Sequence, residues 1–349
     1  MQRVIVCLPV LFMVLLFLSS CSRTVVYLQQ EAGTGVYLTS YPIGNSTPYL
    51  EKMQQSVKRI TSTSYYETYL FDPESQITRA HIDTATSLSD HSVAVIKHNS
   101  TSSGTAVVIH NTDYRIGMIT ARHIITSPDT LIEFRDTEPS FLASVSLKTN
   151  QINWLFDTPY VGPFEVLLSD ENADVAFIGA RVDPDQLDVS VSRQFPVFPY
   201  LFGRPERVGT GTFVYSIGYP KGYPVVTTGI VSESNRGRRH SFITDGLFNA
   251  GFSGGVVVAI NGGLPGFEWV GMARSTSADH YWHLVPDLDN ALDHQTHLPY
   301  RGELFLEQRT QINYGLTHVV SSSRIKNMLE ENAIFLLSKG YNILPLITD

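Results

Sequence analysis

Short apolar runs, separated by turns rich in Gly, Pro, Asn and Asp, fill the chain from about residue 91 to residue 321. Polar and apolar positions alternate in many of these runs, which is typical of strands with one buried face. Residues 104–126 hold two such runs joined by a polar turn and predict a β-hairpin. The spacing of the runs predicts an all-β domain of two packed antiparallel barrels, over about residues 91–195 and 205–320.

The segment before these strands has a different pattern. Residues 22–90 are rich in Ser, Thr and Tyr and hold few sustained apolar runs. We therefore expect a tether there, with one short helix near residues 48–60, where apolar side chains recur at helical intervals. The apolar positions of this expected helix are Leu50, Met53, Val57 and Ile60.

The first 21 residues have the pattern of an export signal. Arg3 precedes a long apolar run, which is too short for a comfortable transmembrane helix, and small residues precede Cys21. The run ends in Leu-Ser-Ser-Cys, which resembles a bacterial lipobox, so we expect an acylated Cys21 that anchors the protein to a membrane of the bacterial cell envelope. Ser22 is not acidic, which favours the outer membrane. The alternative is an ordinary cleaved signal with an incidental cysteine.

Composition bears on two questions, whether the protein binds nucleic acid and whether it forms disulfide bonds. The formal net charge is −8, which argues against nucleic acid as a partner, and the basic residues 236–240 predict a solvated hairpin loop. Cys7 and Cys21 are the two cysteines, and Cys7 is lost with the signal, so no intrachain disulfide is expected. A chain of 349 residues with 43% hydrophobic content is long enough to be held by its core instead.

The strongest chemical signal is Ser253, which lies in the glycine-flanked turn of NAGFSGGVVV just before a β-branched run. Gly251 permits backbone angles closed to other residues, so the N–H groups of Gly251 and Ser253 can converge on a developing oxyanion. The serine would then be the nucleophile of an acyl-transfer enzyme. The alternative is a glycine bulge in a sheet.

A histidine and an aspartate stand where such a serine needs partners. His123 follows the second strand of the predicted hairpin, and Asp174 starts an apolar strand. A carboxylate at that strand end can reach the N–H of a histidine ring, although Asp170 and Asp157 compete for the role. The spacing around Ser253 also satisfies the nucleophile elbow of an α/β-hydrolase, but that elbow must open a helix, and here a strand follows.

These segments together resemble the trypsin-like serine proteases of chymotrypsin fold, and most closely the bacterial high-temperature-requirement proteases. The resemblance covers roughly residues 91–340, and its motifs occur in the family's order. They are Gly104-Thr105-Ala106, Thr120-Ala121-Arg122-His123, Asp174-Val175-Ala176, Ile217-Gly218-Tyr219-Pro220, Gly229-Ile230-Val231-Ser232, Thr244-Asp245 and the turn from Asn249 to Gly255.

The resemblance implies two six-stranded antiparallel barrels with a C-terminal helix, over residues 91–349. Too few residues remain for a peptide-binding PDZ domain to follow, so we expect none. The resemblance also implies a serine endopeptidase that acts on proteins or peptides without a cofactor. Its triad would be His123, Asp174 and Ser253, and its oxyanion hole Gly251 and Ser253. It places Leu247 at the floor of a pocket for small to medium apolar side chains. The walls would come from Met272, Ala273, Arg274, Gly315, Leu316 and Thr317, and Arg274 could favour an acidic residue at a neighbouring subsite.

Two residues depart from the family pattern. Arg122 replaces a small residue beside the histidine and could crowd it, and Phe252 stands directly before the serine. Because no acid precedes the serine, the activation switch of the digestive branch should be absent. An inactive or weakly active protease that serves as a lipid-anchored binding module is therefore the main alternative.

The closing strand of the second barrel has two candidates after the groove strand, residues 267–275. We expect residues 313–321 rather than HYWHLVPD, because a serine-capped helical segment follows, over about residues 322–338. Residues 276–311 then become a long insertion beside the pocket. The insertion repeats an Asp-His-x-x-His pattern, with histidines at His280, His283, His294 and His297. Zinc is one interpretation, but we favour a polar flap without metal.

Overall fold

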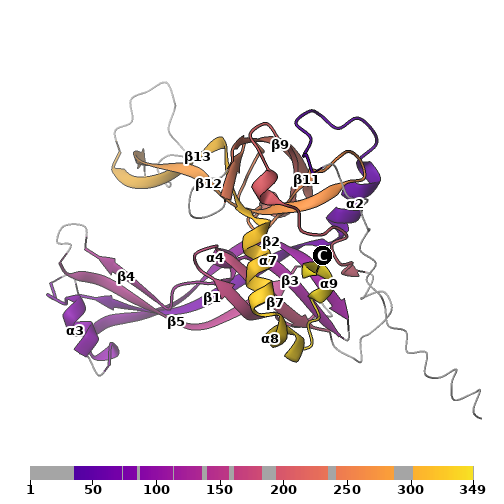
Figure 1. Cartoon of the computed structure of the whole chain (residues 1–349). Helices are drawn as coiled ribbons and strands as arrows, with labels where there is room; N and C mark the ends of the chain where they lie inside the picture. Colours follow the sequence, from indigo (N-terminus) through magenta and orange to yellow (C-terminus); the bar gives the residue numbers. More distant parts are fainter. Residues whose placement is uncertain are drawn as a thin grey trace, which may run out of the picture.

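The computed structural model describes residues 35–72, 74–84, 87–112, 114–135, 140–156, 161–182, 194–234, 241–286 and 302–348. Two β-units lie one above the other in Figure 1, with the C-terminal helices beside them. This arrangement confirms the expected chymotrypsin type of fold. None of the helices in the described residues has the length and apolar character needed to span a membrane.

The N-terminal unit is a seven-stranded antiparallel sheet in the order β4-β5-β1-β2-β3-β7-β6. Its strands are β1 (Val57–Phe71), β2 (Ser92–Thr112), β3 (Arg115–Ala121), β4 (Thr130–Phe134), β5 (Leu142–Leu155), β6 (Glu165–Asp170) and β7 (Val175–Arg181). The expected unit was a closed six-stranded barrel, whereas this sheet is a half-barrel with β4 and β6 as its edges. The reason is length: β1, β2 and β5 continue beyond β3 and β7, so their outer halves project from the body (Figure 1) and cannot help to close a ring.

Part of the segment expected as a tether, residues 22–90, is a long strand of the sheet. The helix α2 (Thr47–Gln55) ends before Val57 and Ile60, which belong to β1. This strand pairs with both β2 and β5 and is therefore central to the sheet. Its inward positions alternate with outward ones but include Ser62, Ser64 and Thr68, which are buried. A strand whose buried face carries hydroxyls shows little apolar periodicity, and this hid it in the sequence.

The C-terminal unit is a closed barrel in the order β10-β13-β12-β11-β8-β9. Its strands are β8 (Phe213–Gly218), β9 (Val225–Glu233), β10 (Ser241–Thr244), β11 (Val256–Ile260), β12 (Phe267–Pro286) and β13 (Leu304–Ser321). The expected closing strand, residues 313–321, is the inner part of β13, which pairs with both β10 and β12. Of the rival segment HYWHLVPD, residues 280–286 are the outer part of β12 and pair with the outer part of β13. The first and last parts of the expected insertion, residues 276–286 and 304–311, therefore form a two-stranded ribbon.

Short helices connect and cover the two sheets. They are α3 (Arg79–Thr84), α4 (Arg122–Ile125), α7 (Ser322–Glu331), α8 (Ala333–Ser338), α9 (Leu344–Ile347) and the 3₁₀ turns η1 (Ser89–His91), η3 (Pro205–Arg207) and η4 (Pro220–Gly222). The helix expected over residues 322–338 is present but divided at Asn332 into α7 and α8. Its serine cap is confirmed, because Ser321 Oγ accepts a hydrogen bond from Ser323 N at 3.2 Å.

One apolar core joins the two units. Ile119 and Phe177 from the half-barrel and Val256 and Trp269 from the barrel belong to the same cluster of buried side chains, together with Met53 of α2. Shared burial of this kind holds the two β-units in one arrangement. The candidate catalytic residues lie next to the end of β3, the start of β7 and the start of β11, at this junction.

Candidate active site

His123 and Asp174 are held together by two hydrogen bonds. His123 lies in α4, directly after β3, and Asp174 directly precedes β7, which pairs with β3. The ring nitrogen His123 Nδ1 lies 2.7 Å from Asp174 Oδ2, and the backbone N–H of His123 donates to Asp174 Oδ1 at 2.9 Å. Oδ2 of the carboxylate therefore orients the histidine ring, and Oδ1 holds the histidine backbone. The histidine side chain itself is 47% exposed.

The charge of the Asp174 carboxylate is favoured by its neighbours. The side chain is 9% exposed, and this burial by itself raises the pKa of the carboxyl. The hydrogen bonds and charge of His123, together with the Arg274 guanidinium, outweigh burial and lower the pKa below its ordinary value of 3.8. The carboxylate is thus ionised at neutral pH and able to stabilise a protonated imidazole. Asp174 has a positive φ of 58°, a conformation that a short polar side chain tolerates better than most.

Arg274 contacts this pair instead of lining a pocket. Its Nε donates to Asp174 Oδ2 at 3.1 Å, and its side chain is 31% exposed. The sequence predicted a wall residue that favours acidic substrate side chains, but the guanidinium is paired with the Asp174 carboxylate. Its backbone carbonyl also accepts the hydroxyl proton of Ser253, with an Oγ to O distance of 2.9 Å. Arg274 therefore connects the acid to the serine.

Ser253 lies in a tight turn that only glycine can build. Gly251 has a φ of 94°, and a Cβ there would lie 2.6 Å from the carbonyl oxygen of Tyr219. Within the described chain, the N–H groups of Gly251 and Ser253 donate to no other protein atom. Two free donors beside a nucleophile are what an oxyanion hole requires. In the described residues, no hydrogen bond joins Ser253 to His123, because the hydroxyl is turned to Arg274.

The elements around Ser253 separate the candidate architectures. The turn is followed by the strand β11, and His123 precedes the serine in the chain. A nucleophile elbow requires a helix at this point and a histidine after the serine, so the α/β-hydrolase alternative is wrong. Phe252, the bulky residue before the serine, is buried and packs against Phe248 with ring centroids 5.8 Å apart. It anchors the turn in the barrel core.

Thr105 ties the nucleophile turn to the half-barrel, a role that the sequence did not reveal although its Gly-Thr-Ala motif was noted. Its backbone N–H donates to the Ser253 carbonyl at 2.8 Å, and its hydroxyl donates to the Gly251 carbonyl at 2.8 Å. The same hydroxyl accepts the N–H of Tyr219 at 2.9 Å. One buried side chain thus fixes both ends of the turn that carries the serine.

The rival acids and the neighbouring arginine have other partners. Asp170 Oδ1 accepts the N–H of Ala173 and serves the turn between β6 and β7. Asp157 lies outside the described residues. Arg122, expected to crowd the histidine, instead donates from Nε to Ser169 Oγ at 3.0 Å and pairs with Glu171 at 3.3 Å. Its side chain therefore engages the β6–β7 turn.

The predicted pocket residues do not form one enclosed site. Leu247, the expected floor, is 60% exposed, whereas the expected wall residues Met272 and Ala273 are buried in the barrel core. Of the second wall, Thr317 is also buried and donates to the Gly246 carbonyl at 2.8 Å. Leu316 is 43% exposed, and Gly315 has open space beside it. The side chains of Met272 and Ala273 are thus part of the barrel core.

Some predictions fall on residues that the structure does not describe. His294, His297, the basic residues 236–240 and the export signal with Cys21 lie outside the described residues. His280 and His283 are on β12, and no group of metal-ligating side chains occurs among the described residues.

The chain matches a known protein family over part of its length. Residues 104–266 match the trypsin-like peptidase domain family. No curated protein sequence matches the chain. Among solved structures, the serine endoprotease from Yersinia pestis is similar over 86% of this chain and 70% of its own, with 16% identity and a TM-score of 0.39. The matched residues include His123, Asp174 and Ser253, so the chain carries a trypsin-like peptidase domain, the domain of a serine protease.

Proposed function

We propose that the protein is a serine endopeptidase in which Ser253, His123 and Asp174 form the catalytic triad. The observation that carries this proposal is the doubly bonded His123–Asp174 pair beside a glycine-built serine turn. Ser253 Oγ attacks the peptide carbonyl carbon while His123 Nε2 takes its proton and later gives it to the leaving amine. Water then repeats the sequence on the acyl-enzyme and restores the serine.

The free N–H groups of Gly251 and Ser253 are the proposed oxyanion hole. Neither N–H donates a hydrogen bond within the described residues. Both can therefore bind the negative oxygen of the tetrahedral intermediate without first losing a partner. Losing one such donor typically costs a factor of about 10² to 10³ in rate. Because both donors are backbone groups, the turn geometry itself sets this part of the catalysis.

Substrate binding is proposed to release the serine. In the unbound protein, Ser253 Oγ donates to the Arg274 carbonyl on β12. A substrate that pairs as an extended strand with this part of β12 brings its own N–H to that carbonyl, and the serine hydroxyl can then rotate to His123 Nε2. Catalytic hydrogen bonds of serine enzymes often tighten only when substrate is bound.

The test is activity-based labelling together with peptide hydrolysis. Wild-type protein should react with a fluorophosphonate probe, and Ser253→Ala and His123→Ala should not. Asp174→Asn should reduce turnover by about 10⁴-fold, because the orienting carboxylate is lost. The double Ser253/His123 variant should be little worse than either single one, since the residues act as a unit. A folded wild-type protein that neither labels nor cleaves would instead support the binding module. Circular dichroism of each variant is the control for folding.

We further propose that cleavage follows apolar side chains of small to medium size and that an acylated Cys21 anchors the protein to the bacterial outer membrane. Both proposals rest on the sequence alone: no carboxylate is found at Leu247, and a lipobox-like segment ends at Cys21. Several acyl chains make an attachment durable, whereas one chain gives only marginal binding. Mass spectrometry of the mature protein from membranes should find a lipidated N-terminal Cys21, and a different or unmodified N-terminus would exclude the anchor.

A further inference from the structure

Side chains from the half-barrel hold the segment that follows His123. Four backbone carbonyls, in the last residues of α4 and in the loop that leads to β4, accept hydrogen bonds from side chains. The donors are Ser102 Oγ to Ile124 O at 2.6 Å, Gln151 Nε2 to Ile125 O at 2.6 Å, Lys148 Nζ to Ser127 O at 2.8 Å and Tyr66 OH to Pro128 O at 2.9 Å. A helix of four residues has few internal hydrogen bonds of its own, so these donors decide where α4 lies.

A β-bulge places two of these donors side by side. Along β1 and β5, Tyr65 pairs with Asn150 but Tyr66 pairs with Lys148, so Thr149 is an extra residue on β5. In a regular strand, residues 148 and 151 would point to opposite faces of the sheet, because side chains alternate. The extra residue brings them to the same face, where Lys148 Nζ lies 3.3 Å from Gln151 Oε1. Bulges of this kind re-aim side chains next to active sites.

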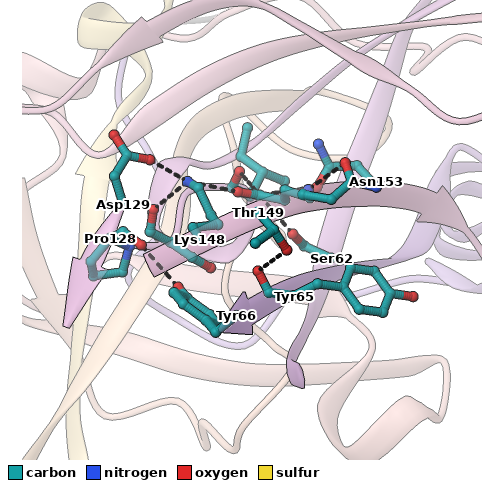
Figure 2. A network of polar contacts seen from close by, with 12 residues as sticks. Ser62, Tyr65, Tyr66, Pro128, Asp129, Lys148, Thr149 and Asn153 are labelled. Atoms are coloured by element: carbon teal, nitrogen blue, oxygen red, sulfur yellow. Dashed lines mark hydrogen bonds and ion pairs between the residues drawn. The ribbon is translucent and has the colours of Figure 1, made fainter. Parts of the chain in front are cut away.

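Lys148 is held by several polar contacts, which Figure 2 shows, and Gln151 also makes several hydrogen bonds. Lys148 Nζ donates to the Ser127 carbonyl and pairs with Asp129 at 2.7 Å, and its side chain is 17% exposed. Gln151 Nε2 also lies 2.9 Å from Ser62 Oγ on β1. The ammonium group of Lys148 is largely buried, and both polar atoms of the Gln151 amide make hydrogen bonds, so neither side chain has much freedom to move. The position of the α4–β4 turn is thereby coupled to β5.

We propose that Lys148 and Gln151, brought together by the bulge at Thr149, are positioning residues for His123. The inference rests on the proposed catalytic role of His123. Gln151 fixes the carbonyl of Ile125 and Lys148 fixes that of Ser127, both close behind the histidine in the chain. On the other side of His123, Asp174 holds its ring and its backbone N–H. Asp174 thus holds the histidine itself, and Lys148 and Gln151 of β5 hold the residues that follow it.

The direct test is Gln151→Glu, which keeps size and the acceptor toward Lys148 but loses the donor to Ile125 O. We expect kcat on a peptide substrate to fall about tenfold while KM changes less than about twofold, because the residue orients the base without touching substrate. Lys148→Met should act in the same direction, and Lys148→Arg, which retains donors, should restore most of kcat. Hydrogen exchange should become faster at the amides of residues 122–127 in Gln151→Glu and Lys148→Met.

The matched control is Ser144→Ala on the same strand. Ser144 is buried and donates to Glu133 Oε2 at 2.9 Å, away from the histidine segment, so the variant should lose stability without losing kcat. Unchanged kcat and unchanged exchange in Gln151→Glu would overturn the proposal, as would an equal loss of kcat in Ser144→Ala. A wild-type protein without labelling or cleavage would overturn the proposed function instead, and the exchange data would still decide whether β5 positions the segment.

Discussion

At the scale of single residues, the Asp174 side chain connects His123 and Arg274. It accepts two hydrogen bonds from His123 and one from Arg274, and these partners lower its pKa although burial opposes them. A group whose pKa is lower in the folded protein than in the unfolded chain binds fewer protons when folded. Its charge therefore stabilises the fold above its ordinary pKa of 3.8, and this contribution is lost as the pH falls through the lowered value.

The resulting prediction concerns the pH dependence of stability. Asp174→Asn should lower the free energy of unfolding relative to wild type at about pH 6, and the difference should shrink as the pH falls to about 3 and below, because wild-type Asp174 then becomes protonated too. Urea denaturation at a series of pH values measures this difference. Glu67→Gln is the control, since it removes only an exposed ion pair with Lys97 and should have little effect throughout. A difference that is constant across the series would show that the charge of Asp174 does not stabilise the fold.

At the scale of elements, the sequence predicted those strands whose buried face is apolar. The hairpin of β2 and β3 and the strand β7 after Asp174 were placed because Val, Ile and Phe mark their inward positions. The closing part of β13 was placed from the serine-capped helix that follows it. The strand β1 was missed, since Ser62, Ser64 and Thr68 take inward positions, and Thr68 makes a hydrogen bond with Ser146 there. Apolar periodicity cannot find a strand whose buried contacts are hydroxyls.

The candidate site shows the same division. Ser253, Gly251, His123 and Asp174 were predicted because their residue types and their places at strand ends indicate chemistry. The pairing of Arg274 with Asp174 could not be predicted, because residues a hundred positions apart meet only once the half-barrel and the barrel have packed. The bulge at Thr149 is equally hidden, since register depends on pairing between strands and not on the pattern within one.

At the scale of the whole molecule, the nucleophile turn is part of the contact between the two β-units. Thr105 of the half-barrel binds the carbonyls of Ser253 and Gly251, and Thr120 Oγ1 donates to the Thr105 carbonyl at 2.7 Å. Gly254 of the barrel approaches the same carbonyl so closely that a Cβ would lie 1.9 Å from its oxygen. The packing of the units and the geometry of the oxyanion donors therefore depend on the same few atoms.

Gly254→Ala should for this reason damage stability and catalysis together. Gly254 and Gly211 have the same φ of 87°, but a Cβ at Gly211 meets nothing within 4 Å. Gly211→Ala should thus lose only the about 1–2 kcal/mol that a left-handed conformation costs a residue with a side chain. Gly254→Ala should lose about 1–3 kcal/mol more, because Thr105 and the serine turn must separate to admit the methyl group. Denaturant unfolding measures both losses. The rate of fluorophosphonate labelling should fall in Gly254→Ala and stay close to wild type in Gly211→Ala, and equal behaviour of the two variants would show that this contact between the units does not shape the site.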